Sequence, residues 1–178
     1  MRVKDICDVD TVNYKKLSMF ISTYTCDFKC DRECGECVCQ NSPLAAEPTI
    51  EVDDEEIVKR FFENPLTEAI VIGGLEPLDD YHEIFNFLCE VRRYMNEHDI
   101  SITEAPDIVI YTGYEVGEFN GIAISLYAFV LPIIMKVGRF IPHQTPHFDE
   151  VLGVELASDN QRGMKLEDVV REFGGFDE

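Results

Sequence analysis

The chain has 178 residues and a formal net charge of -20, from 35 acidic and 15 basic side chains. This charge repels a phosphate backbone, and no run of Lys and Arg interrupts it, so we expect no nucleic-acid partner. The apolar fraction of 46% is that of a globular protein, while no apolar run reaches the roughly 20 residues that cross a bilayer and the N-terminus does not resemble a signal peptide. We therefore expect a single domain over residues 1–178 that lies in the cytoplasm and has no membrane partner.

The first third of the chain predicts one strand and one helix around a loop rich in cysteine. Residues 1–16 are polar and are expected to form an N-terminal lead-in that packs on the outside. Residues 17–24 are β-branched and aromatic, which predicts a buried strand that leads into a cysteine-rich loop over residues 25–48. Asp53 and Glu56 have the spacing of a capping box and predict the start of a helix, which ends at Asn64-Pro65 and whose buried side carries Ile57, Val58, Phe61 and Phe62.

The rest of the chain alternates between short apolar runs and helical patterns. Strands are expected over residues 69–72, 107–111 and 133–137, with a short fifth over 151–156, and helices over about 79–98, over 115–131 with a break near Gly121, and over 166–173, followed by Gly174-Gly175. The long helix is expected to bury Tyr81, Ile84, Phe85, Leu88, Val91 and Met95, with Cys89 as a further small buried residue. This alternation predicts an α/β fold with a mostly parallel sheet, and the length favours a small open partial (β/α) barrel over a closed one.

Five of the seven cysteines lie in one stretch, CDFKCDRECGECVC, which follows the first predicted strand. Thiolates at this density bind zinc or an iron–sulfur cluster, or they pair as disulfides. The reducing cytoplasm favours metal over disulfides. Three thiolates on a [4Fe–4S] cluster leave one iron open for chemistry, whereas a fourth cysteine would close the cluster and indicate a binding or electron-transfer protein. A structural zinc module is the third reading. It leaves unexplained the glycine turn at Gly73-Gly74, which directly follows the strand predicted over residues 69–72.

Several separated motifs occur in the order of one family. They are CDFKC at residues 26–30, GGLEPL at 73–78, YTGY at 111–114, GRFI at 138–141 and SDNQR at 158–162. In these motifs the chain resembles the radical S-adenosylmethionine superfamily, and within it the activases of anaerobic ribonucleoside-triphosphate reductase.

The resemblance implies an oxidoreductase with two cofactors, a [4Fe–4S] cluster and S-adenosylmethionine. Reductive cleavage of the sulfonium would yield a 5′-deoxyadenosyl radical, which generates a glycyl radical on the large subunit of the reductase. A flavodoxin- or ferredoxin-type protein would donate the electron. Because the cofactors carry the chemistry, no catalytic side chain is assigned. The alternatives are a radical enzyme that acts on another protein or on a small molecule, and a non-catalytic iron–sulfur protein.

By resemblance, the three cluster ligands are Cys26, Cys30 and Cys39. The first two flank the aromatic Phe28, as the first two ligands of the family do, and the third follows the apolar Val38. Phe28 and Val38 are accordingly expected to contact the cofactors. This choice leaves eight residues between the second and third ligands.

A second ligand set stays open, because Cys30, Cys34 and Cys37 match the family's usual C-x3-C-x2-C spacing. The glycine turn is expected to meet the amino group of S-adenosylmethionine, with its glycines allowing close approach and its glutamate accepting hydrogen bonds. The remaining residues implied to bind S-adenosylmethionine are Gly73, Gly74, Glu76 and Pro77 in this turn, and Thr112 and Gly113 near the ribose or adenine.

Overall fold

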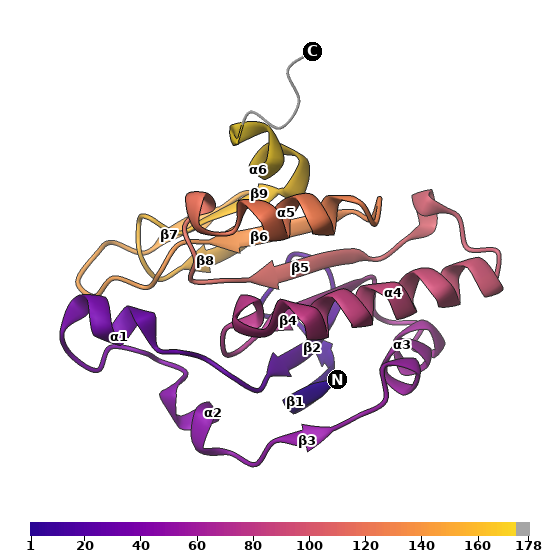
Figure 1. Cartoon of the computed structure of the whole chain (residues 1–178), viewed down its shortest axis with the longest axis horizontal. Coiled ribbons are helices and arrows are strands. Elements are labelled where there is room, and N and C mark those ends of the chain that lie inside the picture. The colour runs from indigo at the N-terminus through magenta and orange to yellow at the C-terminus, as the bar shows by residue number, and fades with distance from the viewer. Residues whose placement is uncertain (174–178) are drawn as a thin grey trace.

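The protein is built on an open seven-stranded sheet, seen in a computed structural model that describes residues 1–173 (Figure 1). The strands follow the order β3-β1-β2-β4-β5-β6-β9. The four central strands are parallel and lie side by side in the sheet in the order β2, β4, β5 and β6. Strands β1, β3 and β9 add antiparallel pairs at the two edges. The bounds are β1 (Arg2–Asp10), β2 (Ser18–Thr23), β3 (Ile50–Glu51), β4 (Ala69–Gly73), β5 (Asp107–Tyr111), β6 (Ile133–Val137) and β9 (Arg162–Lys165). The predicted α/β fold with an open, mostly parallel sheet is confirmed.

Four helices cover one face of this sheet (Figure 1). They are α3 (Asp54–Glu63), α4 (Tyr81–Glu97), α5 (Asn120–Tyr127) and α6 (Leu166–Glu172). Successive strand residues point to opposite faces, so Ile70, Ile108 and Met135 join the main core under the helices. Shorter helical segments lie in the connections: α1 (Lys29–Cys34), α2 (Ser42–Ala46), η1 (Pro77–Asp80), η2 (Ile102–Glu104) and η3 (Val116–Glu118).

A smaller core fills the opposite face of the sheet. Val71 and Val109 point to this side, where they pack with Tyr14, Leu152 and Leu156. The last two residues belong to a two-stranded antiparallel ribbon and its turn, formed by β7 (His147–Asp149) and β8 (Val154–Leu156). Helices therefore lie on one face of the sheet and the ribbon on the other, and the carboxyl ends of the parallel strands meet between them.

The N-terminal segment is not the external lead-in that was expected. It forms β1, which pairs with β2 and β3 inside the main sheet and fully buries Val3. Exposed and partly buried residues alternate along the rest of β1, as in a strand with one solvated face. The strand predicted over 151–156 is also misplaced, because only β8 forms there and it belongs to the separate ribbon. Strand β9 was not predicted.

The helix boundaries were predicted more closely than the buried faces. Asp53 caps α3 as expected, by accepting a hydrogen bond from the Glu55 amide at 2.9 Å. In α4 the buried side contains Phe87, while Phe85 is 36% exposed and Cys89 is exposed rather than buried, because both lie off the helical stripe.

Between β5 and β6 the structure has a single α-helix, α5, preceded by η3. The predicted break near Gly121 lies at Phe119, between these two segments, and Gly121 itself belongs to the first turn of α5. Gly174-Gly175 lie outside the described residues. Among residues 1–173, no helix combines the length and apolar character needed to cross a bilayer.

Candidate functional site

A pocket of about 320 Å³ opens beside the carboxyl ends of the central parallel strands. In folds of this type ligands bind at that edge, because the strand-to-helix loops converge there. The lining combines three parts of the chain: Cys26, Cys30, Cys39, Gln40 and Asn41 from the cysteine loop; Gly74, Leu75, Glu76, Tyr111, Thr112, Gly113 and Lys136 from the strand ends; and Asn13, Phe140, Glu155, Leu156, Ala157 and Gln161 from the surrounding loops and the ribbon.

A second hollow, of about 460 Å³, lies elsewhere, beside α3. Its lining is charged and polar, and Arg60 donates a hydrogen bond to Asp8 across it at 2.6 Å. It holds no cysteine or histidine. We therefore take the pocket that contains the thiols as the candidate site.

The structure brings one of the two proposed cysteine sets to the pocket. Cys26, Cys30 and Cys39 all line it, whereas Cys34 and Cys37 do not. Helix α1 ends at Gly35, whose φ of 74° is left-handed, and Cys37 lies in the exposed segment beyond this point. The thiols that share the pocket are thus those separated by the long gap.

Of the eight residues predicted to bind the cofactors, four line the pocket and four do not. Gly74, Glu76, Thr112 and Gly113 line the pocket. The other four are not part of the lining: Val38, Gly73 and Pro77 lie next to lining residues in the chain, and Phe28 lies between the lining residues Cys26 and Cys30 without adjoining either.

Backbone groups contact two of the three thiols. The amide of Phe28, which has a left-handed φ of 54°, donates to Sγ of Cys26 at 3.3 Å. The backbone of Phe140 faces Cys30 and acts to lower the pKa of its thiol. Burial nevertheless dominates: it raises the pKa of Cys26 to about 12 and also raises the pKa of Cys30. Both groups are neutral thiols at neutral pH without a metal, so binding a metal would release protons.

The sulfur atoms that line the pocket can be compared with those of a single-ion site. A tetrahedral zinc site with Zn–S bonds of about 2.3 Å holds its sulfurs about 3.8 Å apart. Among the described residues, one group of three possible ligands has all donor atoms within 4.8 Å of one another, and it consists of Cys26, Asp27 and Asp79. Cys26, Cys30 and Cys39 do not meet that limit together, so in this structure their sulfur atoms are not spaced as in a single-ion site.

The acidic members of that tight group already have partners within the protein. Asp79 accepts hydrogen bonds from the Asp27 amide at 2.6 Å and from the Tyr114 hydroxyl at 2.8 Å. Asp27 pairs with Arg32 at 2.6 Å. These carboxylates therefore fasten the start of the cysteine loop to η1 and to the loop after β5.

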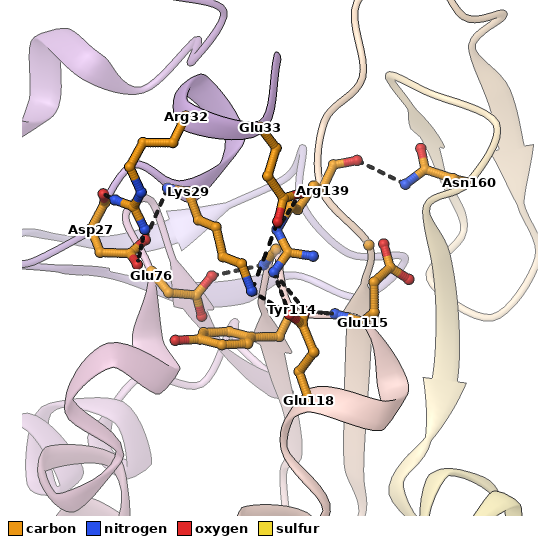
Figure 2. A network of polar contacts seen from close by, with 12 residues as sticks. Asp27, Lys29, Arg32, Glu33, Glu76, Tyr114, Glu115, Glu118, Arg139 and Asn160 are labelled. Atoms are coloured by element: carbon orange, nitrogen blue, oxygen red, sulfur yellow. Dashed lines mark hydrogen bonds and ion pairs between the residues drawn. The ribbon is translucent and has the colours of Figure 1, made fainter. Parts of the chain in front are cut away.

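Glu76 connects the ends of two neighbouring strands (Figure 2). Its Oε1 accepts from the Thr112 hydroxyl at 2.7 Å and the Leu78 amide at 3.0 Å, and its Oε2 accepts from the Gly113 amide at 2.7 Å. Burial raises its pKa to about 7 despite these bonds. Because a carboxylate has about four acceptor positions, one position on Oε2 is left for a ligand.

Lys136 is a pocket residue that the sequence analysis did not single out. It lies in β6 between Met135 and Val137, which face the helices, so its side chain points to the opposite face and into the pocket. Its ammonium group donates to the Gly138 carbonyl at 2.7 Å, and burial lowers its pKa to about 8. Of the described residues that line the pocket, only Lys136 is basic. A lysine within an otherwise apolar strand was the signal available in the sequence.

A charged network fastens α1 to the strand ends, as Figure 2 shows. Lys29 and Glu33 project from α1, and buried Arg139 follows β6. Arg139 donates to both carboxylate oxygens of Glu118, at 2.8 and 2.6 Å, and its Nε lies 3.3 Å from Glu33. Lys29 also pairs with Glu118 and lies over the ring of Tyr114. The network therefore joins the helix that carries Cys30 to the loops after β5 and β6.

The SDNQR segment makes hydrogen bonds within the fold. Gln161 accepts from the amides of Ala157 and Ser158 at 3.1 and 3.2 Å, and Asn160 donates to the Arg139 carbonyl at 2.9 Å. Gly138 has a φ of 94°, and a Cβ there would lie 2.9 Å from the Asn160 carbonyl oxygen. This segment thus supports the turn after β6, and Gln161 reaches the pocket as well.

Comparison with known proteins gives no match: the chain fits no protein-family model, no curated protein and no solved structure.

Proposed function

We propose that the chain holds a [4Fe–4S] cluster through Cys26, Cys30 and Cys39, binds S-adenosylmethionine in the same pocket, and acts as a radical S-adenosylmethionine oxidoreductase. The observation that carries the proposal is the convergence of these three thiols, separated along the loop, on one pocket at the carboxyl ends of a parallel sheet. The resemblance in the separated motifs supports the same function.

The residues of the pocket fit both cofactors. Three soft thiols leave one iron of a cluster without a protein ligand. The free acceptor position on Glu76 suits an ammonium group, and the Lys136 ammonium suits a carboxylate. These are the two charged groups of the methionyl part of S-adenosylmethionine, and the neighbouring Gly74 also lines the pocket.

When bound, the two cofactors supply the one-electron cleavage of the sulfonium that yields a 5′-deoxyadenosyl radical. The protein's part is to hold and orient them. Leu75 and Leu156 contribute apolar surface to the pocket and would help to exclude water from it. A reducing compartment such as the cytoplasm suits the free thiols that this function needs.

For the substrate, we propose a glycine of a glycyl-radical protein, the large subunit of anaerobic ribonucleotide reductase, with a flavodoxin- or ferredoxin-type electron donor. The ribbon occupies one face of the sheet, where Leu152 is fully buried, so a substrate would approach at the mouth of the pocket. A radical enzyme that modifies another protein or a small molecule would use the same pocket, and its products would distinguish it.

The test is reconstitution without oxygen of the wild-type protein and of five single Cys→Ser variants. We expect about four irons per chain in the wild type, an electron paramagnetic resonance signal of the reduced protein that changes on adding S-adenosylmethionine, and formation of 5′-deoxyadenosine. Variants at Cys26, Cys30 and Cys39 should lose the signal, whereas matched variants at Cys34 and Cys37 should keep it.

Two outcomes would contradict the proposal. A cluster signal that does not respond to S-adenosylmethionine, without any cleavage product, would indicate a closed cluster and a binding or electron-transfer protein. Loss of the signal in the Cys34 and Cys37 variants, with retention in the Cys26 and Cys39 variants, would assign the cluster to the other ligand set.

A further inference from the structure

One carboxylate bridges the long gap between the second and third thiols of the pocket. Asp31 follows Cys30 directly, and its Oδ1 accepts hydrogen bonds from the amides of Val38 at 2.9 Å and Cys39 at 2.8 Å. A single side chain thereby connects the residue next to one thiol with the backbone of another. Hydrogen bonds to a charged acceptor are roughly twice as strong as those between neutral groups.

The path of the loop shows why such a contact is needed. Gly35 ends α1 with a left-handed φ of 74°, and its amide donates to the Asp31 carbonyl at 2.9 Å. The chain then reverses through Glu36 and Cys37, both exposed, before it reaches Val38. This returning segment belongs to no strand or helix. The Asp31 carboxylate supplies the acceptor that regular structure would otherwise provide for the returning amides.

Both ends of the cysteine loop are fixed independently of Asp31. At the start, the Asp27 amide donates to Asp79 at 2.6 Å. Beyond the third thiol, Asn41 donates to the Gly74 carbonyl at 2.5 Å. Neither contact acts on Cys39 itself, whose amide is held by Asp31.

We propose that Asp31 is a positioning residue that holds Cys39 beside Cys26 and Cys30, so that three thiols separated by an unusually long gap form one ligand set. The inference rests on the proposed function, because it concerns the ligands of the cluster. Residues that orient metal ligands in this way typically change metal affinity by about 10- to 100-fold when replaced.

The test compares Asp31→Ala and Asp31→Asn with Glu36→Ala, a control in the same loop at an exposed side chain. After reconstitution without oxygen, iron loss to a chelator is timed for each protein. We expect Asp31→Ala to lose iron about tenfold faster than the wild type. Asp31→Asn should be intermediate, because its amide oxygen still accepts hydrogen bonds, and Glu36→Ala should match the wild type.

A second comparison separates positioning from general loss of structure. If Asp31 acts through Cys39 and not through the fold as a whole, then the circular dichroism spectrum of metal-free Asp31→Ala should match that of the wild type. Equal iron loss in Asp31→Ala and the wild type would overturn the inference, and so would a spectrum that shows general loss of structure in Asp31→Ala.

Alkylation of the metal-free protein by iodoacetamide distinguishes failure of this inference from failure of the proposed function. We expect Cys39 to react faster in Asp31→Ala than in the wild type, while Cys37, already exposed, reacts at an unchanged rate. If the wild type binds no iron, the proposed function fails and the alkylation rate of Cys39 alone decides whether Asp31 positions it. An unchanged rate would refute the positioning role.

Discussion

Replacing Glu76 by Gln should change how the stability of the protein depends on pH. Two opposing effects act on this carboxyl group. It is 8% exposed, and burial disfavours its ionised form, while hydrogen bonds from Thr112, Gly113 and Leu78 favour that form. Burial prevails and raises the pKa from its ordinary value of 4.5 to about 7.

The sign and the size of the effect follow from proton binding. Between about pH 4.5 and 7, folded Glu76 retains a proton that the unfolded chain has released, so the free energy of unfolding falls as the pH rises through this range. At 1.36 kcal/mol per pH unit, the rise in pKa corresponds to about 3 kcal/mol, all of it lost once the pH exceeds the folded pKa. The Glu76→Gln variant has no carboxyl group at this position and should lack this decline.

Urea unfolding of the metal-free proteins, followed by circular dichroism from about pH 5 to about pH 7.5, measures both curves. Gln places an N–H opposite the Gly113 amide, where Oε2 of Glu76 accepts a hydrogen bond. The loss of this bond lowers the free energy of unfolding of the variant by an amount that does not depend on pH, so at low pH the variant should be less stable than the wild type. The difference between the two proteins cancels contributions from histidines that both contain. Parallel curves would refute the reasoning. A wild type that gains stability relative to the variant would show that the hydrogen bonds outweigh burial.

Three further substitutions test the glycine turn, an exposed position of α5 and the charged network. Gly74→Ala should lower the free energy of unfolding by about 1–2 kcal/mol, because φ is 83° and the new Cβ would lie 2.9 Å from Leu44 Cδ2. Gly121→Ala in α5, where the new Cβ meets no neighbouring side chain or loop within 4 Å, should raise it by up to about 1 kcal/mol. Thermal unfolding measures both variants, and a shift of both in the same direction would contradict this reasoning. Burial opposes ionisation of Glu118, but hydrogen bonds, first among them that from Lys29, lower its pKa to about 2. The stabilising contribution of ionised Glu118 is therefore complete above about pH 4.5 and is lost as the pH falls toward 2. Acid unfolding followed by circular dichroism should show a smaller loss of stability in Glu118→Gln than in the wild type. Equal losses would refute the lowered pKa of Glu118.

The central strands could be predicted from sequence because their signal is local. Residues 69–72, 107–111 and 133–137 are short apolar runs, and in the structure they are almost wholly buried, with helices on one side and the ribbon or pocket on the other. A strand that is covered on both faces needs apolar residues throughout. An unbroken apolar run in the sequence therefore identifies a strand that is covered on both faces.

The edge strands could not be predicted in the same way. In β9 only Met164 is buried, and the strand depends on Gly163, where a Cβ would lie 2.6 Å from the Asp149 carboxylate. The same carboxylate accepts from the Gly163 amide at 2.8 Å. The pairing of β9 with β6 thus depends on a contact between residues far apart in the chain, which a local pattern does not contain.

The candidate site was predictable to the extent that it follows from topology. Residues directly after parallel strands, such as Gly74 and Thr112, meet at one edge of the sheet once the strands are known. The role of Asp31 depends on how an irregular loop reverses, and the role of Lys136 on which face of β6 points into the pocket. Successive side chains of a strand face opposite sides of the sheet, so the side that Met135 faces determines the side that Lys136 faces. The sequence does not say which side Met135 faces.

The helix that carries Cys30 is held by polar contacts rather than by apolar packing. None of the residues of α1 is buried, so burial of apolar surface cannot fix its position. Lys29 and Glu33 instead engage Glu118 and Arg139, with side chains that are 33%, 50%, 28% and 9% exposed. Exposed ion pairs contribute about 0–1 kcal/mol each, far less than the apparent free energy of about 10–16 kcal/mol with which structural zinc binds cysteine-rich peptides. Polar contacts thus hold the cysteine loop where apolar packing does not, and a metal bound by its three thiols, as proposed above, would add to the free energy that orders it.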